Sequence, residues 1–124
     1  MAQHAPTVAP IDGKAFLVIA YDAADSAAIR EQELTGHLDY VEKRCEQYLV
    51  AGPMRDPESG SIIGSFFLVL AGSAEEAQSL VDGDPYFTSG LYGEVKIHGA
   101  VPAVGRFLGG VIWDDPEALR GRAS

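Results

Sequence analysis

The sequence predicts an α+β fold in which two helices cover one face of a four-stranded antiparallel sheet. Four short apolar segments have the composition of strands, and two segments with helical spacing lie between them, so the order is β-α-β-β-α-β. The chain has 124 residues, of which 47% are hydrophobic and 22% charged. That composition is typical of one soluble globular domain with a single core.

A change in the spacing of the apolar residues predicts the first strand and the first helix. The segment Phe16–Tyr21 is apolar and rich in β-branched and aromatic residues, which predicts a buried strand. Residues 25–47 then switch to the spacing of a helix with one apolar side. That side consists of Leu34, Leu38, Val41 and Cys45. Gly36 is expected to break the helix, with Thr35 as N-cap of its main part, and Cys45 is expected to be a small buried hydrophobe.

Two further apolar runs predict a hairpin. Tyr48–Ala51 and Ser65–Ala71 both have strand composition, and the turn residues of Pro57–Gly60 lie between them. Ser73 and Glu76 then have the spacing of a capping box, which predicts the start of the second helix.

The second helix leads to the last strand. Gly83 suits the left-handed position that ends a helix, and Asp84 followed by Pro85 is a typical start for a short new one. Glu94–His98 alternates polar and apolar residues as a half-exposed strand does. The complete order is the ferredoxin-like arrangement.

Two helices cannot cover both faces of this sheet. The first and third strands carry apolar residues on both sides, and a large uncovered apolar patch is rare on a monomer. We therefore predict a homodimer that forms through the sheet face. The alternative is that the C-terminal tail folds back over its own sheet. The apolar residues that could do so are Phe107, Leu108, Val111, Ile112 and Trp113.

The chain is expected to have three parts. Residues 1–13 are interpreted as a loose N-terminal leader, residues 14–100 as the folded domain, and residues 101–124 as a C-terminal extension that could contact the partner subunit. The leader lacks a charged segment followed by an apolar one, and no apolar run is long enough to span a bilayer. A cytoplasmic protein without a membrane partner is therefore expected.

The charge argues against nucleic acid as a partner. The formal net charge is −9, the pI is about 4.6, and the nine basic residues are scattered. The sequence also lacks the glycine-rich loops that hold nucleotides and the paired His or Cys spacings that hold zinc. No cofactor and no metal are expected, and the expected ligand is a small-molecule substrate.

His37 and Asp84 are the candidate catalytic residues. His37 lies beside Leu34 and Leu38 near the expected helix start, where it is either a partly buried core histidine or an acid–base group. Asp84 is either a helix cap or the carboxylate that orients the histidine. Spacing alone does not choose between these interpretations. Ser65 is a candidate for binding a ligand or an ordinary strand hydroxyl, and Tyr86 either lines a pocket or packs.

Several segments, in this order and spacing, resemble the YCII-related (YciI-like) family across residues 14–100. They are TGHLDYV, Ala51–Pro53, Gly64–Ser65, Ser73–Ala77, and Asp84–Tyr86 followed by SGLY. The resemblance implies a ferredoxin-like dimer of the dimeric α/β barrel type with a His–Asp pair in a pocket, here His37 and Asp84. The leader, the tail and the insertion-like loop of Arg55–Gly60 depart from the family pattern.

Activity follows only in outline from this resemblance. Most of the family is unassigned, some members resemble or are dehydrochlorinases of chlorinated hydroxyaromatics, and the wider superfamily includes muconolactone isomerases and cofactor-free oxygenases. We therefore expect a small cofactor-independent lyase or isomerase in which His37 removes a proton and Asp84 orients it. Ser65, Tyr86 and the Gly52–Pro53 backbone would bind the substrate. The alternative is a non-catalytic binder or accessory subunit that uses the same pocket.

Overall fold

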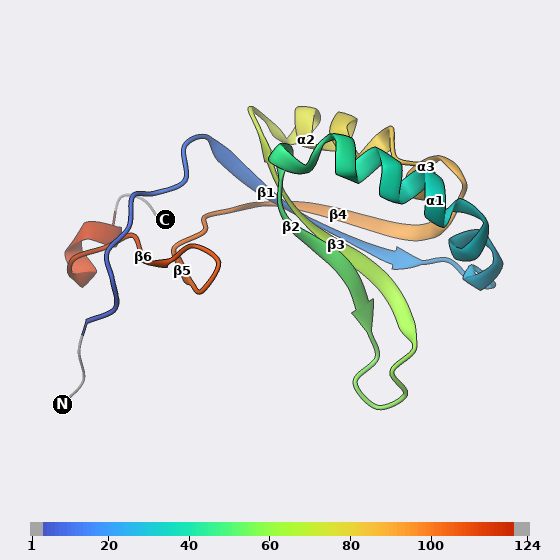
Figure 1. Cartoon of the computed structure of the whole chain (residues 1–124), viewed down its shortest axis with the longest axis horizontal. Helices are drawn as coiled ribbons and strands as arrows, with labels where there is room; N and C mark the ends of the chain where they lie inside the picture. Colours follow the sequence, from blue (N-terminus) through green and yellow to red (C-terminus); the bar gives the residue numbers. More distant parts are fainter. Residues whose placement is uncertain (1–3, 121–124) are drawn as a thin grey trace.

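A computed structural model describes residues 4–120 as an α+β fold, which confirms the predicted ferredoxin-like arrangement. The sheet is antiparallel and has the strand order β2-β3-β1-β4. Its strands are β1 (Lys14–Asp22), β2 (Tyr48–Arg55), β3 (Ile62–Ala71) and β4 (Tyr92–Ala100). The helices α1 (Ala27–Lys43), α2 (Ala74–Asp82) and α3 (Pro85–Thr88) all lie on one side of the sheet (Figure 1).

The core lies between the central strands and α2. Because side chains alternate along a strand, every second residue of β1 and β3 points toward the helices, and Val18 is paired in register with Phe67. Both are buried, as are Ala77 and Val81 on the facing side of α2. The side chains of α2 therefore close the core over the two central strands.

Among residues 4–120, no helix lies over the opposite face of the sheet (Figure 1). The same alternation places a second apolar set there, and the residues of this set are only half-buried. They are Leu17, Ile19, Phe66, Leu68 and Leu70. Folding of one chain thus leaves an apolar sheet face incompletely covered.

Helix α1 differs from its prediction. It is continuous from Ala27 to Lys43, so Gly36 does not break it, and Ser26 rather than Thr35 occupies the N-cap position. His37 consequently lies in the middle of the helix and not at its start. The expected apolar side is not packed into the core either, because no residue of α1 is buried and Leu38 is 52% exposed.

Two smaller expectations about the helices are wrong. Gly83 ends α2 with a φ of −78°, so it is not in the left-handed region. Its role is steric, because a Cβ at this position would come within 2.5 Å of the Tyr40 hydroxyl. Cys45 is exposed in a short turn, η1 (Cys45–Gln47), instead of buried. By contrast, Ser73 caps α2 as predicted and accepts a hydrogen bond from the Glu76 amide.

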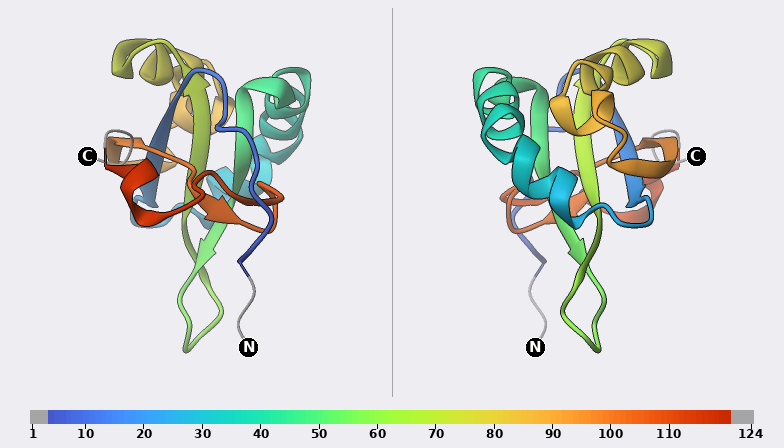
Figure 2. Two further views of the ribbon diagram at one scale, coloured as in Figure 1. Left: turned by 90° about the vertical axis from the view of Figure 1, so that its left-hand side faces the viewer. Right: turned by 90° about the vertical axis from the view of Figure 1, so that its right-hand side faces the viewer.

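Strands β2 and β3 are longer than expected. Gly52 and Pro53 are part of β2, and Pro53 is tolerated because β2 is an edge strand. The loop between the two strands projects away from the rest of the molecule, as both views of Figure 2 show. Asp56 orders this loop by accepting hydrogen bonds from the Ser59 and Glu58 amides, which lower the pKa of its carboxyl.

The two end segments of the described chain pair with each other. Val8 donates a backbone hydrogen bond to Val111, and Val111 donates one to Pro6. The short strands β5 (Val104–Gly105) and β6 (Gly110–Val111) form a separate two-stranded sheet, and η2 (Pro116–Leu119) follows. Figure 1 shows this assembly beyond one end of the main sheet. Residues 1–3 and 121–124, which belong to the predicted leader and extension, lie outside the described residues.

Tyr48 provides a first test of the core. Among residues 4–120, its hydroxyl is buried without a hydrogen-bond partner. Burial and then the charge of Asp84 raise its pKa, so the folded protein favours the neutral phenol. The preference of the folded state for the neutral phenol contributes stability that is fully present below the unfolded pKa of about 10. This stability is lost as the pH rises through the higher folded pKa.

We expect Tyr48→Phe to stabilise the protein at pH 7 by about 1 kcal/mol, because it removes an unsatisfied buried group. It should also lessen the loss of stability above pH 10. Urea denaturation from pH 7 to 11 measures both effects. Tyr92→Phe is the contrasting control, since it removes a hydroxyl that does donate, to Ser65 at 2.8 Å, and should destabilise. A destabilised Tyr48→Phe variant at pH 7 would contradict the prediction.

Candidate functional site

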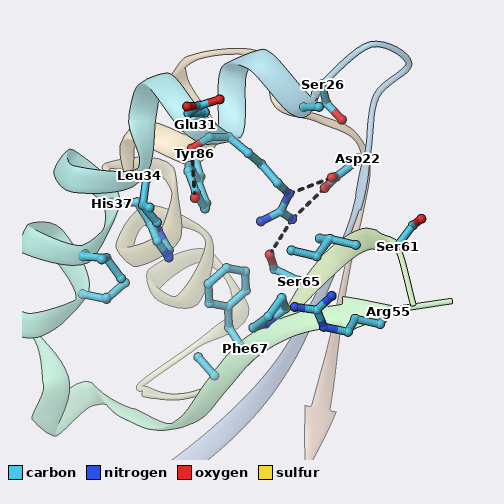
Figure 3. A pocket seen from close by; sticks show the side chains of 18 residues that line it. Asp22, Ser26, Glu31, Leu34, His37, Arg55, Ser61, Ser65, Phe67 and Tyr86 are labelled. Atoms are coloured by element: carbon cyan, nitrogen blue, oxygen red, sulfur yellow. Dashed lines mark hydrogen bonds and ion pairs between the residues drawn. The ribbon is translucent and has the colours of Figure 1, made fainter. Parts of the chain in front are cut away.

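A cavity of about 890 Å³ lies between α1 and the edge of the sheet formed by β2 and β3. It exists because α1 packs against α3 and stands away from these strands. Apolar side chains, including Leu34, Leu38 and Phe67, make up much of its wall. A smaller polar set that includes Arg30 also lines it. Figure 3 shows His37 and Ser65 of this set. An apolar pocket with a few convergent polar groups is the usual form of a small-molecule site.

His37 and Asp84 lie together at this cavity. The His37 Nδ1 atom is 2.7 Å from Oδ2 and 2.9 Å from Oδ1 of Asp84. The Asp84 side chain is fully buried, whereas the His37 side chain is 14% exposed. His37 thus forms part of the cavity wall, and the carboxylate of Asp84 lies behind it.

Asp84 acts on its helix and on His37 at the same time. Its Oδ1 atom accepts a hydrogen bond from the Tyr86 amide at 2.9 Å, which caps α3. A carboxylate only accepts hydrogen bonds, so the proton on His37 is placed at Nδ1. The other ring nitrogen, Nε2, has no hydrogen-bond partner within the described part of the chain. It is therefore the nitrogen that can take a proton.

Two close approaches between α1 and α3 help to position the imidazole ring. Tyr86 stacks on it with ring centroids 3.9 Å apart and an angle of 6° between the planes. Gly36 lets α1 approach α3 closely, since a Cβ at this position would be 3.2 Å from Cγ of Pro85. The missing side chain at Gly36 therefore helps to bring His37 within reach of Asp84.

The other residues expected to bind substrate also line the cavity. Gly52 and Pro53 belong to β2, Ser65 to β3, and Tyr86 to α3. The structure thus brings all the candidate binding residues to one place, with His37 among them and Asp84 behind it.

Sequence reasoning missed a second polar group at the site, formed by Arg30 and Asp22. Two hydrogen bonds join them, from Nε of Arg30 to Oδ2 at 2.7 Å and from Nη2 to Oδ1 at 2.8 Å. Nη2 also donates to Oγ of Ser65 at 3.1 Å (Figure 3). Arg30 and His37 are seven residues apart on α1, a spacing that places them on one side of the helix and could have identified Arg30.

Burial and neighbouring groups shift the pKa values of Arg30 and Tyr92. Burial alone lowers the pKa of Arg30, but hydrogen bonds to Asp22 and the charge of Asp22 outweigh it, so the pKa ends above its ordinary value. Burial also raises the pKa of Tyr92, whose hydroxyl donates to Ser65. At neutral pH the site therefore contains a charged guanidinium and a neutral phenol.

The described residues contain no cluster of three or more His, Cys, Asp or Glu side chains that could hold a metal ion. Within the same part of the chain, none of the helices has the length and apolar character needed to cross a membrane.

Comparisons with known proteins agree with this fold. The model of the YCII-related domain matches residues 15–100. The YciI proteins of Escherichia coli O6:H1 (strain CFT073) and Shigella flexneri are each 32% identical over 89 residues, covering 66% of this chain and 91% of theirs.

A solved structure is also similar, that of 5-chloro-2-hydroxyhydroquinone dehydrochlorinase (TftG) from Burkholderia phenoliruptrix AC1100 in complex with 2,5-dihydroxybenzoquinone. The TM-score is 0.65 and the identity 27%, over 74% of this chain and 96% of TftG. The family match spans more than half of the chain, including both His37 and Asp84. The chain therefore belongs to the YCII-related family.

Proposed function

We propose that this protein is a small enzyme of the lyase or isomerase type that acts on a hydroxylated or carbonyl-bearing cyclic substrate. The observation that carries the proposal is the 2.7 Å contact between His37 Nδ1 and the fully buried Asp84, which leaves Nε2 free at a cavity. A histidine whose tautomer is fixed by a carboxylate is a typical general base. The similarity to TftG, a dehydrochlorinase, supports a reaction of this type.

In the proposed reaction, Nε2 of His37 removes a proton from an acidic O–H or C–H of the substrate. In a dehydrochlorination of the keto tautomer, which carries hydrogen and chlorine on a saturated ring carbon, the electron pair left behind forms a ring double bond and chloride leaves with the electrons of the C–Cl bond. In an isomerisation, the same proton returns to another carbon. Asp84 holds the ring in place and stabilises the imidazolium that forms. No external oxidant or reductant is required for either reaction.

The test is turnover of a panel of chlorinated hydroquinones, polyhydroxylated aromatics and lactones in deuterated buffer. We expect the native protein to act on at least one class of compound in the panel, either by releasing chloride from it or by incorporating deuterium into it. The His37→Ala variant should do neither. The competing interpretation is a non-catalytic binder. It would be supported if a ligand bound equally to native protein and to His37→Ala and no compound in the panel was changed.

We also propose that the protein forms a homodimer through the helix-free face of the sheet. This face is apolar along β1 and β3, where Leu17 pairs in register with Leu68 and Ile19 with Phe66. Lys96 and Glu94 lie beside it on β4, and a second copy related by twofold symmetry can meet such mixed charges with its own. Burial of the apolar set would supply the driving force.

Sedimentation equilibrium tests the dimer. We expect native protein to have twice the mass of the chain and Ile19→Glu to be monomeric, because a charge in the centre of an apolar interface is strongly unfavourable. Phe107→Ser is the control, since Phe107 is 91% exposed between β5 and β6 of the C-terminal hairpin and does not belong to the four-stranded sheet. A dimer that persists in Ile19→Glu but is lost in Phe107→Ser would place the interface at the hairpin.

A further inference from the structure

Two of the polar groups at the cavity have opposite hydrogen-bonding character. His37 presents Nε2, which accepts a proton. Arg30 and Ser65 present N–H and O–H groups. Figure 3 shows His37 and Ser65 at different places on the cavity wall, with the labelled Phe67 and Tyr86 rings also facing it.

A count of donors shows that the second group is incomplete. A guanidinium has five N–H groups, and Arg30 uses only Nε and Nη2, for Asp22 and Ser65. Its Nη1 atom has no acceptor among residues 4–120. Ser65 Oγ accepts from Arg30 and from Tyr92, which occupies both of its lone pairs. The Ser65 hydrogen is therefore also left without an acceptor in that part of the chain.

These unused donors are held in place. The Arg30 side chain is 14% exposed and that of Asp22 10% exposed, and the two hydrogen bonds between them fix the plane of the guanidinium. The Arg30 Cζ atom lies 5.3 Å from the centre of the Tyr86 ring, whose hydroxyl donates to the Arg30 backbone carbonyl. Donors ordered in advance bind an oxygen without the entropic cost of arranging them.

The position of the donors relative to His37 indicates what they bind. Arg30 and His37 are two helical turns apart, or roughly 10 Å along α1, which leaves room for a planar ring between them. Removal of a proton from such a ring at His37 creates negative charge that is delocalised onto its oxygens. A charged N–H donor and a hydroxyl donor at the other end would hold one of these oxygens.

We propose that Nη1 of Arg30 and Oγ of Ser65 form a subsite for an ionised oxygen, a phenolate or enolate, of a planar cyclic ligand. The direction of proton flow rests on the proposed function, but binding of the anion does not. Asp22 positions Arg30 and is not expected to touch the ligand. The overall charge of −9 repels anions at long range, so we ascribe the expected preference for the ionised form to donors at the cavity and not to the net charge.

The probe is 4-nitrophenol, whose neutral and ionised forms absorb at different wavelengths. We expect native protein to bind the phenolate in preference to the phenol, so that the bound probe is ionised at a pH where the free probe is still largely neutral. Arg30→Gln should weaken phenolate binding by about 10- to 100-fold, the range for loss of one hydrogen bond to a charged group. Binding of nitrobenzene, which has no hydroxyl, should not change.

Two variants control for folding and charge. Ser65→Ala keeps the Arg30–Asp22 pair intact and should still weaken phenolate binding by several-fold, so the proposal can be tested even if Arg30→Gln does not fold. Arg44→Gln is the matched control, because Arg44 also lies on a tyrosine, Tyr40, but does not line this cavity. Phenolate binding should be unchanged in Arg44→Gln. Native protein that binds phenol and phenolate equally, or Ser65→Ala and a folded Arg30→Gln that keep the preference, would overturn the subsite.

The fate of the proposed function can be separated from that of the subsite. His37→Gln should keep the preference for phenolate while it loses turnover. If His37→Gln instead turns over substrate as fast as native protein and still prefers phenolate, the general-base proposal is wrong and the anion subsite stands. If phenolate preference is absent while turnover still depends on His37, the subsite is wrong and the proposed function stands.

Discussion

Replacing His37 with glutamine is expected to lower turnover by about 10²- to 10⁴-fold, the usual contribution of a general base. The glutamine amide can still donate to Asp84, which keeps the buried carboxylate paired and the fold intact. The ring nitrogen that takes the proton is lost. The effect should therefore fall on kcat and leave KM nearly unchanged. Steady-state kinetics on the substrate identified from the panel measures both.

His4→Gln is the matched control for this substitution. His4 is exposed near the N-terminus, and its Nδ1 atom lies 2.7 Å from the carbonyl oxygen of its neighbour Ala5. The same chemical change at His4 should leave kcat as it is. A His37→Gln variant with native kcat would show that His37 only packs against Tyr86 and that the proton is removed elsewhere.

Replacing Asp84 with alanine is expected to lower the free energy of unfolding by about 2–4 kcal/mol. The helix cap contributes about 0.5–2 kcal/mol of this. Loss of the carboxylate also leaves Nδ1 of His37 without an acceptor, and an unpaired buried group costs about 1–3 kcal/mol. Urea denaturation monitored by circular dichroism measures the change.

Two comparisons separate the roles of Asp84. Ser73→Ala removes a cap of the same kind from α2 but affects no histidine, so we expect a loss of only about 1 kcal/mol. Asp84→Asn keeps an oxygen that can cap α3, so much of the stability should return while turnover stays low. Equal losses in Asp84→Ala and Ser73→Ala would mean that the contact with His37 adds nothing to stability.

Period and turn chemistry were sufficient for the elements of the fold but not for the packing of α1. Strand β1 was predicted because its apolar run has the length of a buried strand and is too short for a helix. Helix α2 was predicted because Ser73 and Glu76 mark its start. The prediction of a break at Gly36 was wrong because a glycine destabilises a helix by only about 1 kcal/mol. Helix α1 has 17 residues, and the small residue allows its close approach to Pro85.

The site was predictable only in part, for a related reason. A helical spacing identifies which residues share a face, but it does not say whether that face lies on the sheet or beside a cavity. Leu34 and Leu38 have the pattern of core residues, yet they line the cavity and are about half exposed. The pair of Arg30 and Asp22 joins two elements, and such a contact has no signature in local sequence.

The pairing of Val8 with Val111 closes a loop on the order of 100 residues, which is far longer than any hairpin in the chain. During synthesis Val8 cannot pair until Val111 has left the ribosome, by which time nearly the whole domain has been made. The main sheet can form first, so we expect the joined ends to be the last part to assemble and the first to open. Backbone amides of Val8 and Val111 should accordingly exchange with solvent before those of β1 and β3.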